Sequence, residues 1–127
     1  MKHNEISGAI IDHSVKIHKA LGPGLLESVY QCILVYELRK AKFDVQAEVS
    51  VPVKWDKHEI ENGFQADLIV NGLVLVELKS VETIAKVHFK QTLTYLKLTD
   101  LKLGLLINFG APKVKDGIHR LVNGLDC

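Results

Sequence analysis

Two short apolar runs, residues 64–70 and 73–79, stand on either side of Asn71-Gly72. An Asn-Gly pair between two such runs is a strong signal for a β-hairpin, because both residues tolerate the positive φ angles of a tight turn. Short and almost continuous apolar runs are also typical of buried strands. The chain is therefore expected to place an antiparallel hairpin inside its core.

The second run, "LVLVELK", carries two charged residues near its end, Glu77 and Lys79. Strand residues two apart point to the same face, so these two side chains project together while their apolar neighbours point the other way. The first run contains one ionisable residue, Asp67. An isolated carboxylate in such a run is costly unless it is paired or bound to a metal. The end of this hairpin is therefore expected to carry a functional site.

The length of the turn decides whether the two acids can meet. With a two-residue turn at Asn71-Gly72, Asp67 and Glu77 point to opposite faces of the sheet. With a three-residue loop, residues 71–73, or with one bulge, Asp67 lies opposite Glu77. We predict this shifted register.

Helices and further strands are expected around the hairpin. Apolar residues recur at helical spacing over about residues 4–21, and "GPG" at 22–24 ends that segment. The other expected elements are a helix over about 25–41, an alternating strand over 45–55, a polar turn-like segment over 55–63, a helix over about 84–98, a buried strand over 101–109 and a last short strand near 118–122. The order ααβββαβ predicts an α/β (α+β) fold with a mixed β-sheet flanked by helices.

Length and composition indicate one folded domain over residues 1–127, since 47% of the residues are hydrophobic and 24% are charged. The formal net charge is only +1, so a polyanionic partner would have to bind a local basic patch. No apolar stretch reaches the ~18 residues of a membrane span, and the first residues lack the apolar core of a signal peptide. We therefore expect a cytoplasmic protein without a membrane partner.

Three motifs resemble those of known nucleases. Asp67, followed by Glu77-Leu78-Lys79, resembles the D…(D/E)xK core of the PD-(D/E)XK nuclease superfamily, whose members mostly cut DNA or RNA with magnesium. "QTLTY", residues 91–95, resembles the QxxxY motif of the RecB-type nucleases, and "GLLESVY", residues 24–30, matches the pattern that names the GxxExxY family. The resemblance implies a restriction-endonuclease-like fold. The sequence departs from the superfamily pattern at Ala66, where the proline of the superfamily's name would stand.

The resemblance also implies a role for each site residue. Asp67 and Glu77 would bind Mg²⁺, or Mn²⁺ in its place, with the backbone carbonyl of Leu78 completing the coordination. Glu27 would be a third acid at the metal, directly or through water; judged without the family, it is an ordinary acidic residue in a first helical turn. Lys79 would hold or activate the attacking water and stabilise charge on the phosphate. Oxygen ligands of this kind are those that magnesium selects.

Two further residues flank Glu27 in the same motif. Gly24 would supply backbone freedom where the second helix begins. Tyr30 lies one turn beyond Glu27, where it could orient that carboxylate or simply pack in the core. The buried side of this helix is predicted to consist of Leu26, Val29, Tyr30, Ile33 and Leu34.

The helix expected over about 84–98 carries two polar stripes. Gln91 and Tyr95 are four residues apart and project from one stripe, which the resemblance places near the scissile phosphate or the metal-bound water. The alternative is a polar edge on a packed helix, and we interpret the neighbouring His88 as structural.

A basic stripe lies on the same helix. Lys86, Lys90 and Lys97 fall within an arc of about 40°. They could contact a nucleic-acid backbone or form an ordinary solvated face.

Two functions remain open at this point. The first is a magnesium-dependent deoxyribonuclease, a hydrolase of phosphodiester bonds serving DNA repair or processing, with DNA favoured over RNA. Its small size suggests a homodimer or a protein partner. The second is a non-catalytic module that keeps the nuclease fold and binds nucleic acid or protein. The presence of every ionisable site residue favours the first, because burying them without a metal would destabilise the domain.

Overall fold

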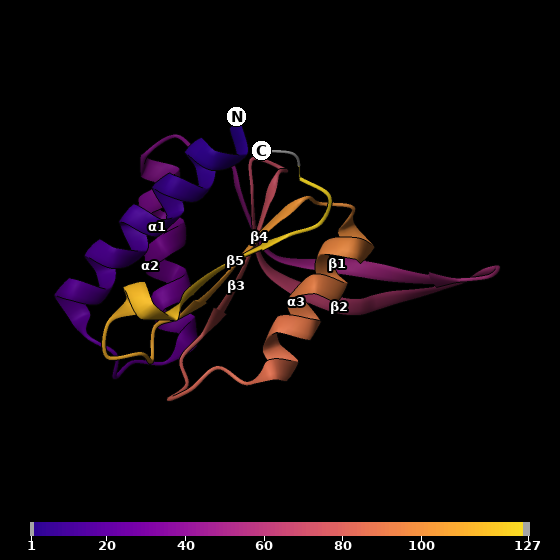
Figure 1. Cartoon of the computed structure of the whole chain (residues 1–127). Coiled ribbons are helices and arrows are strands. Elements are labelled where there is room, and N and C mark those ends of the chain that lie inside the picture. The colour runs from indigo at the N-terminus through magenta and orange to yellow at the C-terminus, as the bar shows by residue number, and fades with distance from the viewer. Residues whose placement is uncertain (1, 126–127) are drawn as a thin grey trace.

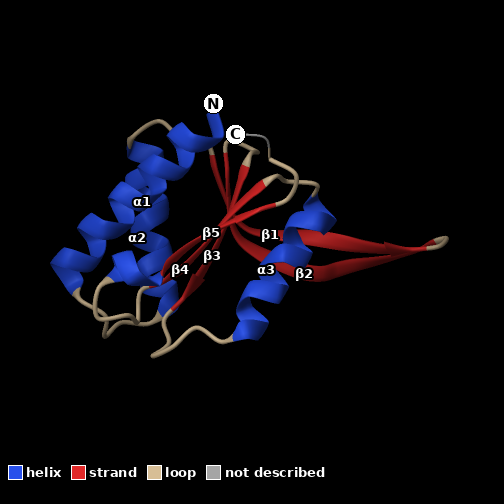
Figure 2. Ribbon diagram, in the orientation of Figure 1, coloured by secondary structure: helices blue, strands red, loops and turns tan. Residues whose placement is uncertain are grey.

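The computed structural model describes residues 2–125 and shows a five-stranded sheet between two helical layers (Figures 1 and 2). Helices α1 (Lys2–Leu21) and α2 (Glu27–Lys40) cover one face, and α3 (Lys86–Thr99) covers the other. The strands are β1 (Val45–Trp55), β2 (His58–Val70), β3 (Val74–Lys79), β4 (Leu103–Asn108) and β5 (Ile118–Val122), with a short 3-10 helix, η1 (Val114–Gly117), before the last. Within residues 2–125, no helix has the length and apolar character needed to cross a membrane.

The sheet is mixed, with the strand order β1-β2-β3-β4-β5. Strands β3 and β4 are parallel, and every other neighbouring pair is antiparallel. Helix α3 lies in the connection between β3 and β4, as a crossover between parallel strands requires. The predicted element order and the mixed sheet flanked by helices are confirmed, including a last strand at Ile118–Val122.

The polar segment 55–63 differs from its prediction. Only Asp56 and Lys57 form a turn, and β2 already begins at His58. Strands β1 and β2 therefore continue as a two-stranded ribbon beyond the rest of the sheet (Figure 1). Residues 58–62 of β2 are exposed on both faces of the ribbon, so this part of the sequence lacks the apolar alternation by which a half-buried strand is recognised.

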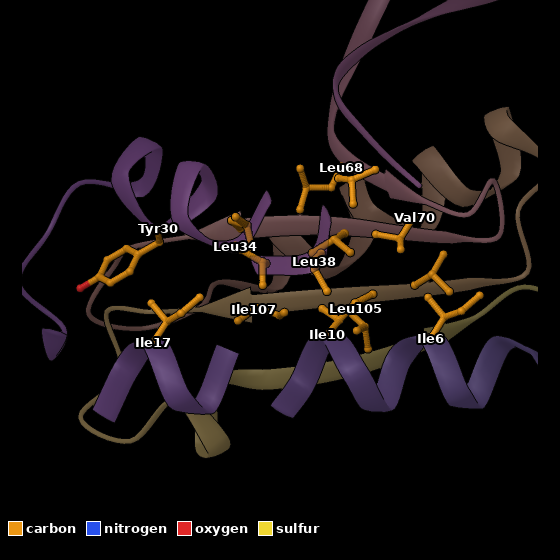
Figure 3. Close-up of a cluster of buried hydrophobic side chains, with 14 of the residues drawn as sticks. Ile6, Ile10, Ile17, Tyr30, Leu34, Leu38, Leu68, Val70, Leu105 and Ile107 are labelled. Atoms are coloured by element: carbon orange, nitrogen blue, oxygen red, sulfur yellow. The ribbon is translucent and has the colours of Figure 1, made fainter. Parts of the chain in front are cut away.

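Two apolar clusters fill the spaces between the layers. The larger one joins Ile6, Ile10 and Ile17 of α1 to Leu34 and Leu38 of α2 and to the even-numbered residues of β3 (Figure 3). The second lies under α3 and includes Ile69, Leu75, Leu96 and Leu106.

The predicted buried side of α2 needs one correction. Leu26 is 74% exposed and Val29 is 38% exposed. Helix α2 begins only at Glu27, and its packed face is the row Tyr30, Leu34 and Leu38, spaced four residues apart. Leu26 precedes the helix and Val29 lies beside that row, so both remain in contact with solvent.

The shifted register of the central hairpin is confirmed. Val70 pairs with Val74, so residues 71–73 form a three-residue loop. Asn71 and Gly72 both have positive φ angles, and the Leu73 N–H donates to the Val70 carbonyl at 3.0 Å. Extending this register places Asp67 opposite Glu77, as the sequence predicted.

Candidate active site

Asp67 and Glu77 meet where β2 and β3 stop pairing. The last paired residues are Leu68 and Val76. One step further, the carboxylates replace backbone carbonyls as acceptors: the Asp67 N–H donates to Glu77 Oε2 at 3.0 Å, and the Leu78 N–H donates to Asp67 Oδ2 at 2.8 Å. Each carboxylate is thus held by the backbone of the opposite strand. We call Asp67 and Glu77 the acid pair.

Burial and nearby charges shift the pKa values of several side chains in and around the acid pair. Glu77 is only 7% exposed, and this burial, reinforced by the charge of Asp67, raises its pKa to about 8. Burial also raises the pKa of Glu27; the charge of Asp67 raises it further, whereas Lys79 lowers it. The pKa of Tyr95 is raised by burial and by the charges of Glu77 and Asp67. Side chains from α2, β2, β3 and α3 therefore share one electrostatic environment.

The chemistry of this donor set fits a hard divalent cation. Its charged donors are carboxylate oxygens, which suit magnesium or manganese better than a thiophilic metal. Burial and the charge of Asp67 raise the pKa of Glu77 and so favour its protonated form, and a bound cation would replace that proton. Across residues 2–125, no three His, Cys, Asp or Glu side chains are arranged to hold a metal ion. The acid pair is the part of this donor set that backbone hydrogen bonds hold in place.

Glu27 and Leu78, the other two predicted metal ligands, lie beside the acid pair in different ways. Glu27, in the first turn of α2, interacts with Asp67 through its charge without completing a three-carboxylate cluster. For Leu78, the backbone N–H binds Asp67 and the side chain is fully buried. Coordination by the Leu78 carbonyl remains a prediction.

Lys79 ends β3 directly beyond the acid pair, in a half-buried position. Its carbonyl accepts the Phe109 N–H at 2.8 Å, which continues the parallel pairing with β4. The next residue, Ser80, donates through its hydroxyl to the Leu25 carbonyl at 2.8 Å. This bond ties the end of β3 to the segment before α2, the helix that carries Glu27, whose pKa the charge of Lys79 lowers.

Asn108 holds the chain that follows Lys79, and sequence reasoning missed it. Its side chain is 2% exposed and accepts the N–H groups of Val81 and Gly110 at 3.0 Å each, while its amide donates to the Val81 carbonyl at 2.8 Å. A polar residue at the end of the buried run "LKLGLLINF" is the same kind of signal that identified Glu77.

Tyr30 fastens the loop before α2 and makes no hydrogen bond to Glu27. Its hydroxyl donates to the Gly22 carbonyl and accepts the Leu25 N–H at 3.1 Å. Its buried ring stacks on Phe109, with 4.4 Å between the ring centroids. In Figure 3 the hydroxyl lies at the edge of the apolar cluster. Any orienting effect on Glu27 therefore acts through the loop backbone.

The role predicted for Gly24 belongs to Gly22. The φ angle of Gly22 is +74°, whereas that of Gly24 lies outside the left-handed region. A Cβ added to Gly24 would meet no atom within 4 Å. The positive φ angle that favours glycine occurs at Gly22, where the chain reverses after α1. Position 24 does not require a glycine.

Replacing Tyr30 with phenylalanine is expected to lower the free energy of unfolding by about 1–3 kcal/mol, because the Gly22 carbonyl and the Leu25 N–H lose a buried partner. Urea unfolding measures this change. The matched control is Tyr36→Phe, whose ring is 63% exposed and whose effect should stay within about 0.5 kcal/mol. Equal stability of the two variants would show that the hydroxyl does not hold the loop.

Helix α3 brings Tyr95 into the electrostatic environment of the acid pair. Tyr95 stacks on Phe64 of β2 with 4.0 Å between ring centroids, and Gln91, one turn earlier, is exposed. The Nδ1 of His88 accepts the Ala85 N–H at 3.1 Å where α3 begins, which agrees with the structural role predicted for this residue.

The basic stripe of α3 is exposed along its whole length. Lys86, Lys90 and Lys97 are all accessible to solvent. Their lack of burial agrees equally with a nucleic-acid contact and with an ordinary solvated face, so the contact remains a prediction.

A family model described as the PD-(D/E)XK nuclease superfamily matches residues 4–121, nearly the whole chain. No curated protein and no solved structure matches. The match includes Glu27, the acid pair, Lys79 and Tyr95.

Proposed function

Since the chain belongs to the PD-(D/E)XK nuclease superfamily, whose nucleases generally use divalent metal ions, we propose that it is a magnesium-dependent deoxyribonuclease. The observation that carries the proposal is the acid pair, locked across two strands directly before Lys79. Superfamily membership supports nuclease chemistry and a nucleic-acid substrate. The choice of DNA over RNA and of magnesium over other cations belongs to the proposal.

In this function Asp67 and Glu77 would hold Mg²⁺ or Mn²⁺, the Leu78 carbonyl would add a backbone ligand, and Glu27 would add negative charge, directly or through water. When bound, the cation supplies charge neutralisation at the phosphate and lowers the pKa of nearby water. Lys79 donates a hydrogen bond to the phosphate or to the attacking water and stabilises the negative charge that develops.

The helix α3 supplies the remaining contacts to the substrate. Gln91 and Tyr95 orient the scissile phosphate beside the acid pair. Lys86, Lys90 and Lys97 bind backbone phosphates further along the strand. The finer assignments to the GxxExxY family and to RecB-type nucleases, a cytoplasmic role in DNA repair or processing, and a homodimer or protein partner are parts of the same proposal.

Thermal unfolding with and without metal tests the cation site. Magnesium at about ten times its dissociation constant should raise the Tm by about 5 °C over EDTA, because the folded state alone binds it. Glu77→Ala should abolish this shift, whereas Glu82→Ala, which removes an exposed carboxylate, should keep it. A wild-type protein without any shift in millimolar magnesium or manganese would favour the non-catalytic binding module.

A further inference from the structure

The outer part of the β1–β2 ribbon has no role in the site described above. Residues 52–62, which we call the arm, project away from both helical layers (Figures 1 and 2). A two-residue turn at Asp56 and Lys57 joins the two strands at the tip. At the base, Gly63 lies against Val53, and an added Cβ there would overlap the valine side chain. The arm is therefore a defined ribbon that leaves the sheet at a fixed place.

One face of the arm is apolar and carries no carboxylate. Trp55 pairs with His58, and Val53 pairs with Ile60, so these four residues share a face. We call it the Trp55 face. Trp55 is 76% exposed and Ile60 is 56% exposed. The pair of Lys54 and Glu59 lies on the opposite face.

The arm is continuous with the acid pair. Asp67 and His58 lie on the same strand, nine residues apart, which corresponds to about 30 Å at ~3.3 Å per residue. Between them, Phe64 stacks on Tyr95, whose pKa is raised partly by the charges of the acid pair. The base of the arm is thus anchored beside the candidate active site.

The size of the Trp55 face argues for a small flat ligand. A buried tryptophan covers about 150–250 Å², so two arms packed face to face would bury on the order of 600 Å². This is well below the ~1,200 Å² of a stable protein interface. A nucleobase, in contrast, needs only one aromatic face to stack on.

We propose that the Trp55 face stacks on an unpaired base of the nucleic-acid substrate, and that the substrate therefore carries a single-stranded segment next to the cleaved bond. This inference rests on the proposed nuclease function and names its substrate class. Bases inside a duplex have both faces covered by neighbouring pairs, so the arm discriminates against the interior of a continuous duplex. The charges of the arm nearly cancel, with Lys54 and Lys57 against Asp56, Glu59 and Glu61, and its contribution should therefore depend little on salt.

Trp55 is the only tryptophan of the chain, so its fluorescence reports directly on the arm. The probe is an oligothymidylate of about twelve nucleotides. It is titrated into the Lys79→Ala protein in a buffer that contains magnesium, and the substitution prevents cleavage during the titration. Binding, followed by anisotropy of a labelled copy, should coincide with quenching of Trp55 by an unlabelled copy. Trp55→Ala should weaken binding about tenfold, and Trp55→Phe should restore most of it. The matched control is Tyr36→Ala, which removes an exposed aromatic ring of α2.

Oligonucleotide length separates the arm from the active site. At ~3.4 Å per stacked nucleotide, about nine nucleotides span the ~30 Å between them. Trp55→Ala should therefore weaken binding of the twelve-nucleotide probe and leave that of a four-nucleotide probe unchanged, at low and at moderate salt alike.

Three results would overturn the inference, and they are distinguishable. Normal binding and cleavage with unchanged Trp55 fluorescence would show that the arm does not contact the substrate, while the proposed nuclease function would stand. Fluorescence that changes with protein concentration, together with a lower sedimentation mass for Trp55→Ala, would assign the face to a second copy of the chain. No binding and no cleavage of any oligonucleotide would overturn both proposals.

Discussion

Replacing Glu77 with glutamine is expected to stabilise the metal-free protein at pH 8 and to lower the cleavage rate about 10³-fold. Burial, reinforced by the charge of Asp67, raises the pKa of Glu77 from its ordinary value of 4.5 to about 8. The folded state therefore binds this proton more tightly than the unfolded state does. The resulting stability is fully present below about pH 4.5 and is lost as the pH rises through about 8. Glutamine carries no charge to desolvate and can still accept the Asp67 N–H.

The measurement is urea unfolding in EDTA between about pH 5 and 8, with wild type and Glu77→Gln side by side. The free energy of unfolding should fall with pH for wild type and stay nearly level for the variant, so that the two curves separate towards pH 8. With magnesium present, cleavage by the variant should drop about 10³-fold, because an amide is a much poorer ligand than a carboxylate. Parallel pH curves would contradict the assignment, and Glu82→Gln serves as the exposed control.

Replacing Lys79 with methionine should separate chemistry from metal binding. The variant keeps the half-buried aliphatic stem and loses only the ammonium group. We expect the metal-induced rise in Tm to persist, because the acid pair is intact, while the single-turnover cleavage rate falls about 10²- to 10⁴-fold. Both quantities should be measured on the same preparation.

Two further variants control this experiment. Lys79→Arg keeps the positive charge and should retain part of the activity, whereas Lys102→Met changes an exposed lysine and should have no effect. Loss of the metal-induced shift in Lys79→Met would mean that the lysine supports the structure of the site. Unchanged cleavage would remove it from the mechanism.

The core hairpin could be predicted because two independent constraints agreed. The turn chemistry of Asn71-Gly72 located the reversal, and the need to bring Asp67 and Glu77 together selected the register that the structure has. Alternating apolar residues then decided which face was core. Residues 56–62 of the arm escaped prediction for the opposite reason, since their exposed side chains leave no apolar periodicity to read.

The site was predictable only where its residues are close in sequence or share a strand. The bond from Ser80 to the Leu25 carbonyl joins residues 55 positions apart, and the bonds of Asn108 to Val81 span 27 positions. Such contacts depend on how the helical layers pack against the sheet, which no local pattern encodes. The same holds for Tyr30, whose position in a motif suggested Glu27 as its partner but whose hydroxyl binds the loop.

The most direct test of the nuclease function is cleavage of end-labelled single-stranded, flap and duplex DNA and of RNA, by wild type and by Lys79→Ala. The account predicts cleavage of DNA by wild type with magnesium or manganese, strongest on substrates with a single-stranded segment. It predicts none in EDTA and almost none by the variant, whose folding is checked by its unchanged urea unfolding curve. Equal traces from both proteins, or no cleavage of any substrate by wild type with either metal, would contradict it.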